Sequence, residues 1–234
     1  QNQSSAASDV YKRQDMDAFA LASQKRAANA IEKGYFKDQI TPVKITKKRE
    51  EFAFDTDEHV RGETTADGLA SLRPAFDKEG QVTAGNSSGI NDGAAALILG
   101  NAEKVEKSNK SPLAKIISYG FGGVAPRIMG MGPVPASKMA LERAGLKVSQ
   151  IDIVESNEAF AAQACAVSKE LSLPSDIVNP NGGAIALGHP VGATGAIIMT
   201  KLIYELHRTG GRYGLATMCI GGGQGIAVII DTQV

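Results

Sequence analysis

The chain of 234 residues contains 43% hydrophobic and 21% charged residues, and its 25 basic residues balance its 25 acidic residues. This composition supports a buried core and excludes an intrinsically disordered chain. The balanced charge gives no basic surface for nucleic acid or an anionic membrane, and no apolar run reaches the ~18 residues of a membrane span. Two cysteines cannot form a disulfide framework, so we expect a reducing compartment and assign the protein to the cytoplasm.

The first 14 residues, QNQSSAASDVYKRQ, are polar, lack an initiator Met and have neither signal-peptide nor transit-peptide features. We therefore expect a non-native or disordered leader over residues 1–14. Beyond it, apolar side chains recur at helical spacing and Gly34 supplies a stop signal, which predicts an amphipathic helix over residues 15–33. The apolar face of this helix contains Met16, Phe19, Ala20, Ala27, Ala30 and Ile31.

The next stretch has little regular periodicity. Residues 42–46 predict a short strand, and the charged residues 47–51 predict its solvated continuation. Residues 55–92 are rich in Asp, Thr, Gly and Asn, which is typical of a loop, and a loop of this length is usually functional or disordered. The apolar run 93–99 predicts a strand buried on both faces. A short helix is expected over residues 102–108.

Strands and helices alternate in the C-terminal half. We expect strands over residues 114–122, 151–155 and 177–179, helices over residues 133–144, 158–171 and 193–207, and a closing hairpin of residues 214–220 and 225–230. The helix 158–171 directs Ala161, Ala164, Cys165 and Val167 inward. This alternation predicts a layered α/β fold, and the hairpin makes its sheet mixed.

The glycine-rich loop 181–195 contains five glycines and one histidine, His189. Glycine permits a positive φ or a close approach to a ligand, and histidine is the side chain that titrates most readily near neutral pH. The loop therefore indicates a site around His189. The alternative is a turn-rich connection with a chance histidine, which is the more common state of a lone His.

Two other polar side chains lie at element ends, where ligand sites of open α/β sheets gather. Asn157 follows a strand, and Cys219 lies at the hairpin bend. An imidazole, a thiol and an amide can perform acyl transfer or proton abstraction, because the imidazole activates the thiol and the amide stabilises an oxyanion. A buried, inert cysteine remains the alternative.

Three motifs carry a family resemblance: Asn-Glu-Ala-Phe at 157–160, the glycine-rich loop 181–195 and Cys-Ile-Gly-Gly-Gly at 219–223. Together with residues 82–96 and 129–136, they resemble the thiolase family in order and content, over almost all the chain from Asp15. The resemblance implies a thiolase-like layered α/β fold, a mixed sheet covered by helices. It is present only as the C-terminal half and part of the loop domain.

The domain boundaries implied by the resemblance follow the motif order. Residues 15–90 would form a partial loop domain, and residues 91–111 the last strand and helix of an otherwise missing N-terminal domain. Residues 112–234 would form the C-terminal domain.

The resemblance implies an acyltransferase that condenses two acetyl-CoA molecules into acetoacetyl-CoA and CoA, or runs the reverse thiolysis of a 3-ketoacyl-CoA. His189 would activate the nucleophilic cysteine, and Asn157 would fix a water at the first oxyanion site. Cys219 would be the acid/base that takes a proton from the second acetyl group. Gly221 would offer its N–H to a second oxyanion site.

The implied CoA contacts are Arg61, Ser88, Met129, Ala159 and Phe160. No cofactor or metal is expected, because CoA thioesters are substrates, and the full-length protein is expected to be a homodimer or homotetramer. His59 lies among charges and could approach CoA. His207 is expected at the surface, and residues 47–49 are expected in a solvated turn.

The resemblance fails at one point. The family's acyl-carrying cysteine belongs before Asp15, and neither Cys165 nor Cys219 takes its place in the pattern. Two hypotheses follow: the chain represents an incomplete working thiolase, or it is a non-catalytic fragment that acts only as a CoA-binding or interaction module. In either case, a strand and a helix face made for burial would be exposed, which predicts association or low stability.

Overall fold

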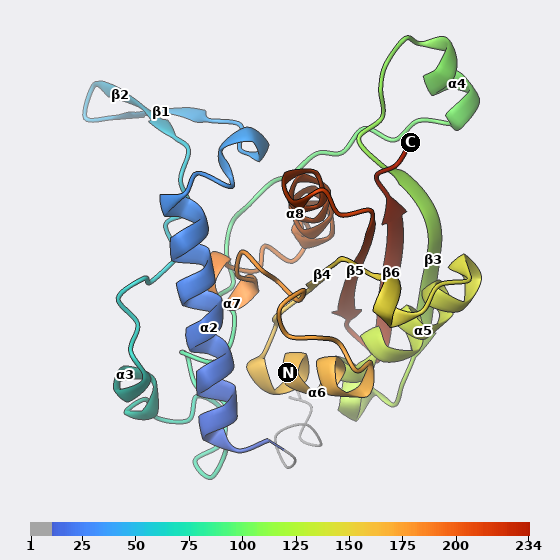
Figure 1. Cartoon of the computed structure of the whole chain (residues 1–234). Helices are drawn as coiled ribbons and strands as arrows, with labels where there is room; N and C mark the ends of the chain where they lie inside the picture. Colours follow the sequence, from blue (N-terminus) through green and yellow to red (C-terminus); the bar gives the residue numbers. More distant parts are fainter. Residues whose placement is uncertain (1–10) are drawn as a thin grey trace.

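The centre of the molecule is a four-stranded mixed sheet with strand order β3–β6–β5–β4 (Figure 1). The computed structural model describes residues 11–234. Its sheet consists of β3 (Lys115–Gly123), β4 (Ile153–Ser156), β5 (Tyr213–Ile220) and β6 (Gln224–Asp231). Strands β4 and β5 are parallel, whereas β6 is antiparallel to both β5 and β3. The predicted mixed sheet and closing hairpin are therefore confirmed.

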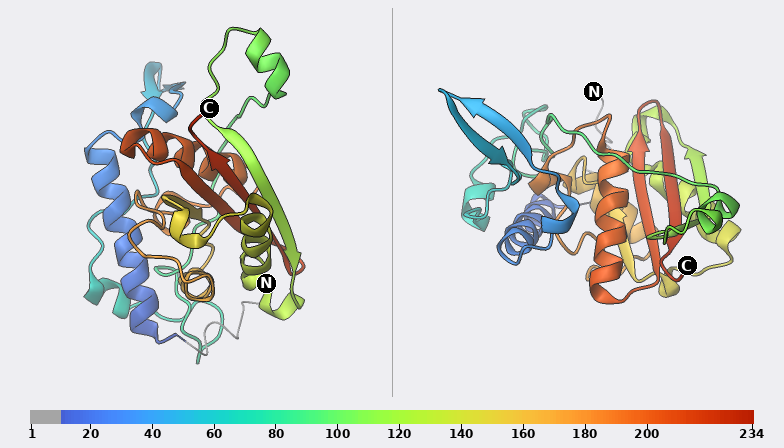
Figure 2. Two further views of the ribbon diagram at one scale, coloured as in Figure 1. Left: turned by 45° about the vertical axis from the view of Figure 1, so that its right-hand side comes forward. Right: turned by 90° about the horizontal axis from the view of Figure 1, so that it is seen from above.

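Helices cover both faces of this sheet (Figure 2). On one face lie α5 (Pro133–Ala144) and α6 (Ala161–Glu170), which bury a core that includes Val154, Val167 and Ile229. On the other face, α8 (Thr194–Thr209) packs Leu202 and its neighbours against the strands. The apolar stripe of each helix thus meets one face of the sheet, which gives the expected layered fold.

Helix α5 has the predicted bounds because both of its ends carry strong local signals. Pro133 opens the helix, and Gly145 ends it in the left-handed conformation with φ of 65°. The helix lies close to β3, where a Cβ on Gly120 would collide with the backbone of Ala136. Glycine in the strand therefore sets the distance between α5 and the sheet.

Helix α2 (Arg13–Glu32) forms an outer layer against α6 and the short helix α7 (Ala184–Leu187). It begins two residues before the predicted start, because Arg13 pairs with Asp17 at 2.7 Å and donates to the carbonyl of Leu69. Residues 1–10 of the predicted leader lie outside the described residues. Cys165, which was expected inside, is only half-buried. Helix α7 and the 3₁₀ turns Lys37–Gln39, Pro126–Met131 and Val148–Gln150 were not predicted.

A two-stranded hairpin projects from the body of the molecule (Figures 1 and 2). It consists of β1 (Val43–Lys47) and β2 (Glu50–Phe54), joined by Lys48 and Arg49 with φ of 51° and 75°. The strand at 42–46 and the turn at 47–49 are confirmed, but the predicted continuation over 47–51 is wrong because the chain reverses there. Apart from α3 (Ala66–Ala70), most of residues 55–92 are irregular, as expected.

The predicted buried strand at 93–99 is wrong. These residues form no strand and are exposed, with Ile98 fully accessible and Leu99 76% exposed. A strand buried on both faces needs paired neighbours and covering helices, and the described residues supply neither at this place. The following helix, α4 (Ala102–Lys107), is confirmed. The predicted strand at 177–179 is reduced to a single bridge between Val178 and Val154.

Among residues 11–234, no helix combines the length and apolar character needed to cross a membrane. Because the apolar residues 93–99 are exposed, we still predict that the chain associates.

Replacing Leu202 by Ala removes a fully buried side chain between α8 and the sheet. We expect the free energy of unfolding to fall by about 2 to 5 kcal/mol, because a cavity remains in the core. Urea denaturation followed by circular dichroism measures the change. Ile98→Ala is the control, since the Ile98 side chain is exposed and its loss should alter stability by less than about 0.5 kcal/mol. Equal losses in the two variants would contradict the assigned core.

Candidate functional site

The backbone around His189 is held by a segment distant in the sequence. The His189 N–H donates to Oδ1 of Asn91 at 3.1 Å, and Ile90 forms a parallel bridge with His189. The preceding Gly188 has a φ of 97°, and a Cβ there would collide with the Asn91 side chain. Glycine at this position therefore permits the close approach that fixes the histidine backbone.

The imidazole of His189 lies between Thr194 and Asn157. Its Nδ1 is 2.7 Å from the hydroxyl of Thr194, and that hydroxyl donates its own hydrogen to the Pro190 carbonyl at 3.0 Å. Because the hydroxyl has only one hydrogen, Nδ1 must donate to it. The lone pair therefore sits on Nε2, which accepts from Nδ2 of Asn157 at 3.4 Å. Burial lowers the pKa of His189, so the ring is neutral at pH 7.

Asn157 leaves the end of β4 beside β5. Its N–H donates to the carbonyl of Thr217 at 3.0 Å, and its side chain is buried. Cys219 lies two residues further along β5, opposite Gly225 of β6. Burial raises the pKa of Cys219, which favours the neutral thiol. Gly221 is exposed in the turn between β5 and β6. Asn157, Cys219 and Gly221 therefore lie at the same end of the sheet, and the glycine-rich loop carries the fourth predicted catalytic residue, His189.

Three of the predicted CoA contacts lie together. The Ser88 N–H donates to the carbonyl of Ala159 at 3.0 Å, and Ser87 forms an antiparallel bridge with Phe160. The ring of Phe160 meets Phe76 edge-on, with centroids 6.2 Å apart. Two residues beyond Ser88, the same segment reaches His189. This group therefore lies next in sequence to the segment that contacts the backbone of His189.

The other two predicted CoA contacts lie apart from this group. Arg61 is exposed, and its backbone N–H donates to Oε1 of Gln24 at 2.8 Å. Met129 is half-buried in the 3₁₀ turn Pro126–Met131. Among the described residues, no hydrogen bond joins either of them to the other predicted site residues.

Sequence reasoning missed Asn91 and Thr194, and it placed His59 near CoA rather than beside Asn91. Asn91 uses Oδ1 for the His189 backbone, so its Nδ2 donates to Nδ1 of His59 at 3.3 Å. Burial and then the nearby Arg61 lower the pKa of His59, which keeps this ring neutral as the acceptor. Asn91 lies inside the matched stretch 82–96, but its partner is 98 positions away, which no local pattern reveals. Thr194 had a weak signal, as the only hydroxyl in the glycine-rich loop.

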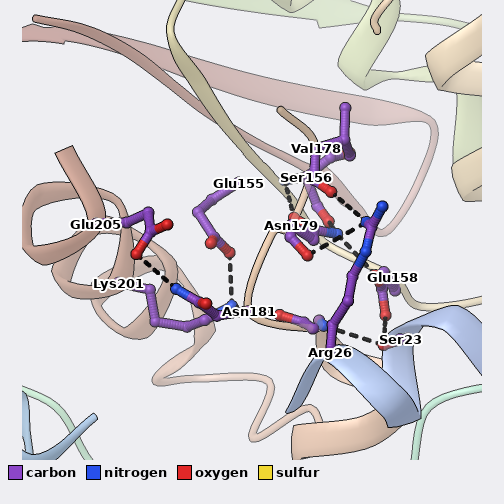
Figure 3. Close-up of polar contacts among 12 residues, drawn as sticks. Ser23, Arg26, Glu155, Ser156, Glu158, Val178, Asn179, Asn181, Lys201 and Glu205 are labelled. Carbon is purple, nitrogen blue, oxygen red and sulfur yellow. Dashed lines mark hydrogen bonds and ion pairs between the residues drawn. The ribbon is translucent and has the colours of Figure 1, made fainter. Parts of the chain in front are cut away.

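Hydrogen bonds from the charged side chains of Glu158 and Arg26 join the segments next to the site (Figure 3). The carboxylate of Glu158, next to Asn157, accepts from Ser23 at 2.7 Å, from Asn179 at 2.8 Å and from the Ile185 N–H at 3.2 Å. Arg26 of α2 donates to the carbonyl of Val178 at 2.7 Å. These bonds tie the glycine-rich loop and α2 to the end of β4.

Comparison with known proteins gives a consistent result. The model for the thiolase C-terminal domain matches residues 110–232, and that for the thiolase N-terminal domain matches residues 2–103. The beta-ketothiolase BktB of Cupriavidus necator is 57% identical over 220 residues, which cover 94% of this chain and 56% of that protein. An acetyl-CoA acetyltransferase of Shinella zoogloeoides is 53% identical with the same coverage.

The fold is also that of a solved structure. The acetyl-CoA acetyltransferase of Bacillus anthracis superposes with a TM-score of 0.95 and 47% identity, covering 98% of this chain and 59% of that one. The chain thus spans between half and two thirds of the length of these proteins.

The protonation of His189 can be followed directly by NMR. Because burial lowers its pKa, we expect its Cε1 proton to titrate with a midpoint below the ordinary value of 6.5. The folded chain then binds this proton less readily than the unfolded chain. The contribution of His189 to stability is complete above about pH 6.5 and is lost as the pH falls through the lowered pKa. His189→Gln identifies the resonance, and a midpoint above 6.5 would contradict the buried neutral ring.

Proposed function

Because the chain belongs to the thiolase family, we propose that the protein containing it is an acyl-CoA C-acetyltransferase. It joins two acetyl-CoA molecules in a Claisen condensation to give acetoacetyl-CoA and CoA, or cleaves a 3-ketoacyl-CoA in the reverse direction. The names of the acetyltransferase relatives support this reaction. The observation that carries the proposal is the Asn157–His189 contact, which lies at the sheet edge where Cys219 emerges.

His189 is the base that activates the acyl-carrying cysteine. Its Nδ1 proton is held by Thr194, so the lone pair is on Nε2, and it accepts the thiol proton when the thiol displaces the 3.4 Å contact from Asn157. The resulting thiolate attacks the thioester carbonyl, and CoA thiolate leaves as the acyl-enzyme forms. Protonated Nε2 then becomes a hydrogen-bond donor, which suits it to stabilise a thioester oxygen.

Asn157 and Gly221 stabilise negative charge on oxygen. Nδ2 of Asn157 points toward the same region as Nε2 of His189, so a water held by this amide completes a first oxyanion site. The exposed turn of Gly221 offers a backbone N–H for a second site at the enolate oxygen. An enolate needs such fixed donors, because the α-proton of a thioester is only weakly acidic.

Cys219 is the acid/base for the second substrate. In thiolysis, its thiol gives a proton to the departing carbanion and the resulting thiolate then activates CoA. In condensation, the Cys219 thiol first protonates the CoA thiolate that leaves on acylation, and the resulting Cys219 thiolate then removes the α-proton of the second acetyl group. The raised pKa of the buried Cys219 supports the thiol as the resting form. A base of high pKa also matches the weak acidity of the proton that it removes.

The substrates bind through their CoA portions at Ser88, Met129, Ala159 and Phe160, with Arg61 at the phosphate or adenine end. The grouping of Ser88, Ala159 and Phe160 beside the His189 segment supports this assignment. A guanidinium suits phosphate oxygens. The reaction needs no cofactor, because the thioester itself supplies the reactive group. We place the full-length protein in the cytoplasm as a homodimer or homotetramer.

For the isolated chain we propose a second function, that of a non-catalytic module that binds CoA or another protein. Its basis is the position of the two cysteines. Cys165 lies in α6, where burial raises its pKa to about 12, so it is a poor nucleophile. Cys219 already serves as the acid/base. Neither residue provides the thiol that His189 would activate.

Two variants of the full-length protein separate the two chemical steps. His189→Ala should slow acylation by acetyl-CoA by about 100-fold or more, because the thiol loses its base. Cys219→Ala should form the acyl-enzyme normally but should not exchange the methyl protons of acetyl-CoA with deuterated water. Rapid-quench mass spectrometry follows both products. Unchanged acylation in the first variant, or unchanged exchange in the second, would contradict the assigned roles.

An activity assay on the isolated chain of 234 residues distinguishes the two functions. Mixed with acetoacetyl-CoA and CoA, the chain should give no acetyl-CoA above the level of its own Cys219→Ala variant, as measured by chromatography. The full-length protein under the same conditions should be active. Turnover by the isolated chain above that control would rule out the module.

A further inference from the structure

A small cavity lies on the inner side of Asn157. Its volume is about 20 Å³, and its lining includes Glu155, Asn157, Thr194 and Lys201. It is thus enclosed by the end of β4, the glycine-rich loop and the first turns of α8. A cavity needs roughly 10 to 15 Å³ to hold one water molecule, together with two to four polar partners. The volume therefore fits a single water.

A buried ion pair lies in the wall of this cavity (Figure 3). The Lys201 ammonium donates to Oε2 of Glu155 and to the carbonyl of Gly182, each at 2.7 Å. The side chains of Lys201 and Glu155 are 7% and 1% exposed. An ammonium has three N–H groups, so one donor remains beyond these two bonds.

Two acceptors in the same wall also remain. Oε1 of Glu155 and Oδ1 of Asn157 are buried and have no hydrogen-bond partner among the described residues. The hydroxyl of Ser156 is also without a partner among these residues, but in the strand its side chain points to the opposite face from Glu155. A buried polar atom without a partner is destabilising, because its lost hydration is not replaced. One donor and two acceptors around a water-sized space are the groups that an ordered water satisfies.

We propose that this cavity binds one water molecule, which accepts from the Lys201 ammonium and donates to Oε1 of Glu155 and Oδ1 of Asn157. Lys201 and Glu155 are thereby positioning residues for Asn157. The site lies on the inner side of the amide, whereas the water proposed for the oxyanion site lies on the side of Nδ2.

The water fixes which end of the Asn157 amide faces His189. With Oδ1 held toward the cavity, Nδ2 donates to the Nε2 lone pair of His189. A flipped amide would place its NH₂ group toward the Lys201 side and Oδ1 against that lone pair. The two acceptors Oδ1 and Nε2 would then repel each other. The water, which would accept from both the ammonium and the NH₂ group, would have one O–H left without an acceptor. The water held by the buried cation thus favours the observed orientation of an amide that the cation does not touch.

The first test is a crystal structure of the full-length protein at a resolution that shows ordered water. We expect one water peak within hydrogen-bond distance of Nζ of Lys201, Oε1 of Glu155 and Oδ1 of Asn157. An empty cavity, or a direct bond between Lys201 and Asn157, would overturn the proposal. This result does not depend on catalysis, so it is distinguishable from a failure of the proposed function, which would appear as an inactive native protein.

The second test concerns positioning and rests on the proposed function. Lys201→Met alone leaves the Glu155 carboxylate buried without a cation, which is destabilising in itself. The double variant Lys201→Met with Glu155→Gln removes both charges together and keeps the shapes. In the full-length enzyme, we expect its kcat to fall about tenfold with KM unchanged, because the oxyanion donor loses its orientation.

Lys138→Met is the matched control, since Lys138 is exposed on α5 and its loss should leave kcat unchanged. Thermal unfolding shows whether the double variant is folded. A folded double variant with native kcat would overturn the positioning role. If the double variant does not fold, Glu155→Gln alone serves instead. An amide holds the Lys201 ammonium less firmly than a carboxylate does, so kcat should fall while KM stays unchanged. A folded Glu155→Gln variant with native kcat would overturn the positioning role.

Discussion

The buried carboxylate of Glu158 is the interaction on which the site depends, because it joins three segments of the chain. It accepts hydrogen bonds from α2 through Ser23, from Asn179 after the bridge to β4, and from the Ile185 N–H in the glycine-rich loop. Burial raises the pKa of Glu158, and the bonds from Ser23 and Asn179 oppose this rise. A buried carboxylate is tolerated only when such bonds replace its lost hydration. Since Glu158 follows Asn157 directly, these hydrogen bonds set how far the loop lies from the Asn157 amide.

The same arrangement explains why the site needs its glycines and its outer helix. A side chain on Gly183 would collide with the Glu158 carboxyl group, so only glycine lets the loop approach. The Gly183 N–H in turn donates to Oγ of Ser23 at 3.0 Å. Helix α2 therefore does more than cover a core. It supplies the hydroxyl between the carboxylate and the loop backbone, and its apolar face packs against α6, which begins shortly after Asn157.

Local signals were sufficient to predict most elements of the C-terminal half of the fold. Helix α5 carries its own start and stop signals, and the closing hairpin carries a glycine-rich turn, so neither needs distant contacts to be predicted. The predicted strand at 93–99 is wrong because an apolar pattern shows that a segment can be buried. It does not show that neighbouring strands and helices are present to bury it. The contacts that orient the site were missed for the opposite reason. Asn91 and Lys201 are polar residues whose partners lie 98 and 46 positions away, and such pairs leave no periodic trace.

The proposed chemistry requires a thiol to reach Nε2 of His189, and an open groove lies beside the loop that carries this residue. A groove of about 430 Å³ runs between Asn91–Ala95 and Pro190–Ala193, directly after the bridged pair Ile90 and His189. Ile90 and Val191 at its borders are 87% and 66% exposed. Exposed apolar side chains of this kind at the rim of a groove are typical of a surface that another structural element covers. The inner side of the imidazole is occupied by Thr194, so the thiol must come from the opposite, Nε2 side. The glycine-rich loop therefore forms one side of the proposed site, and the proposed mechanism requires another segment to carry the thiol to it.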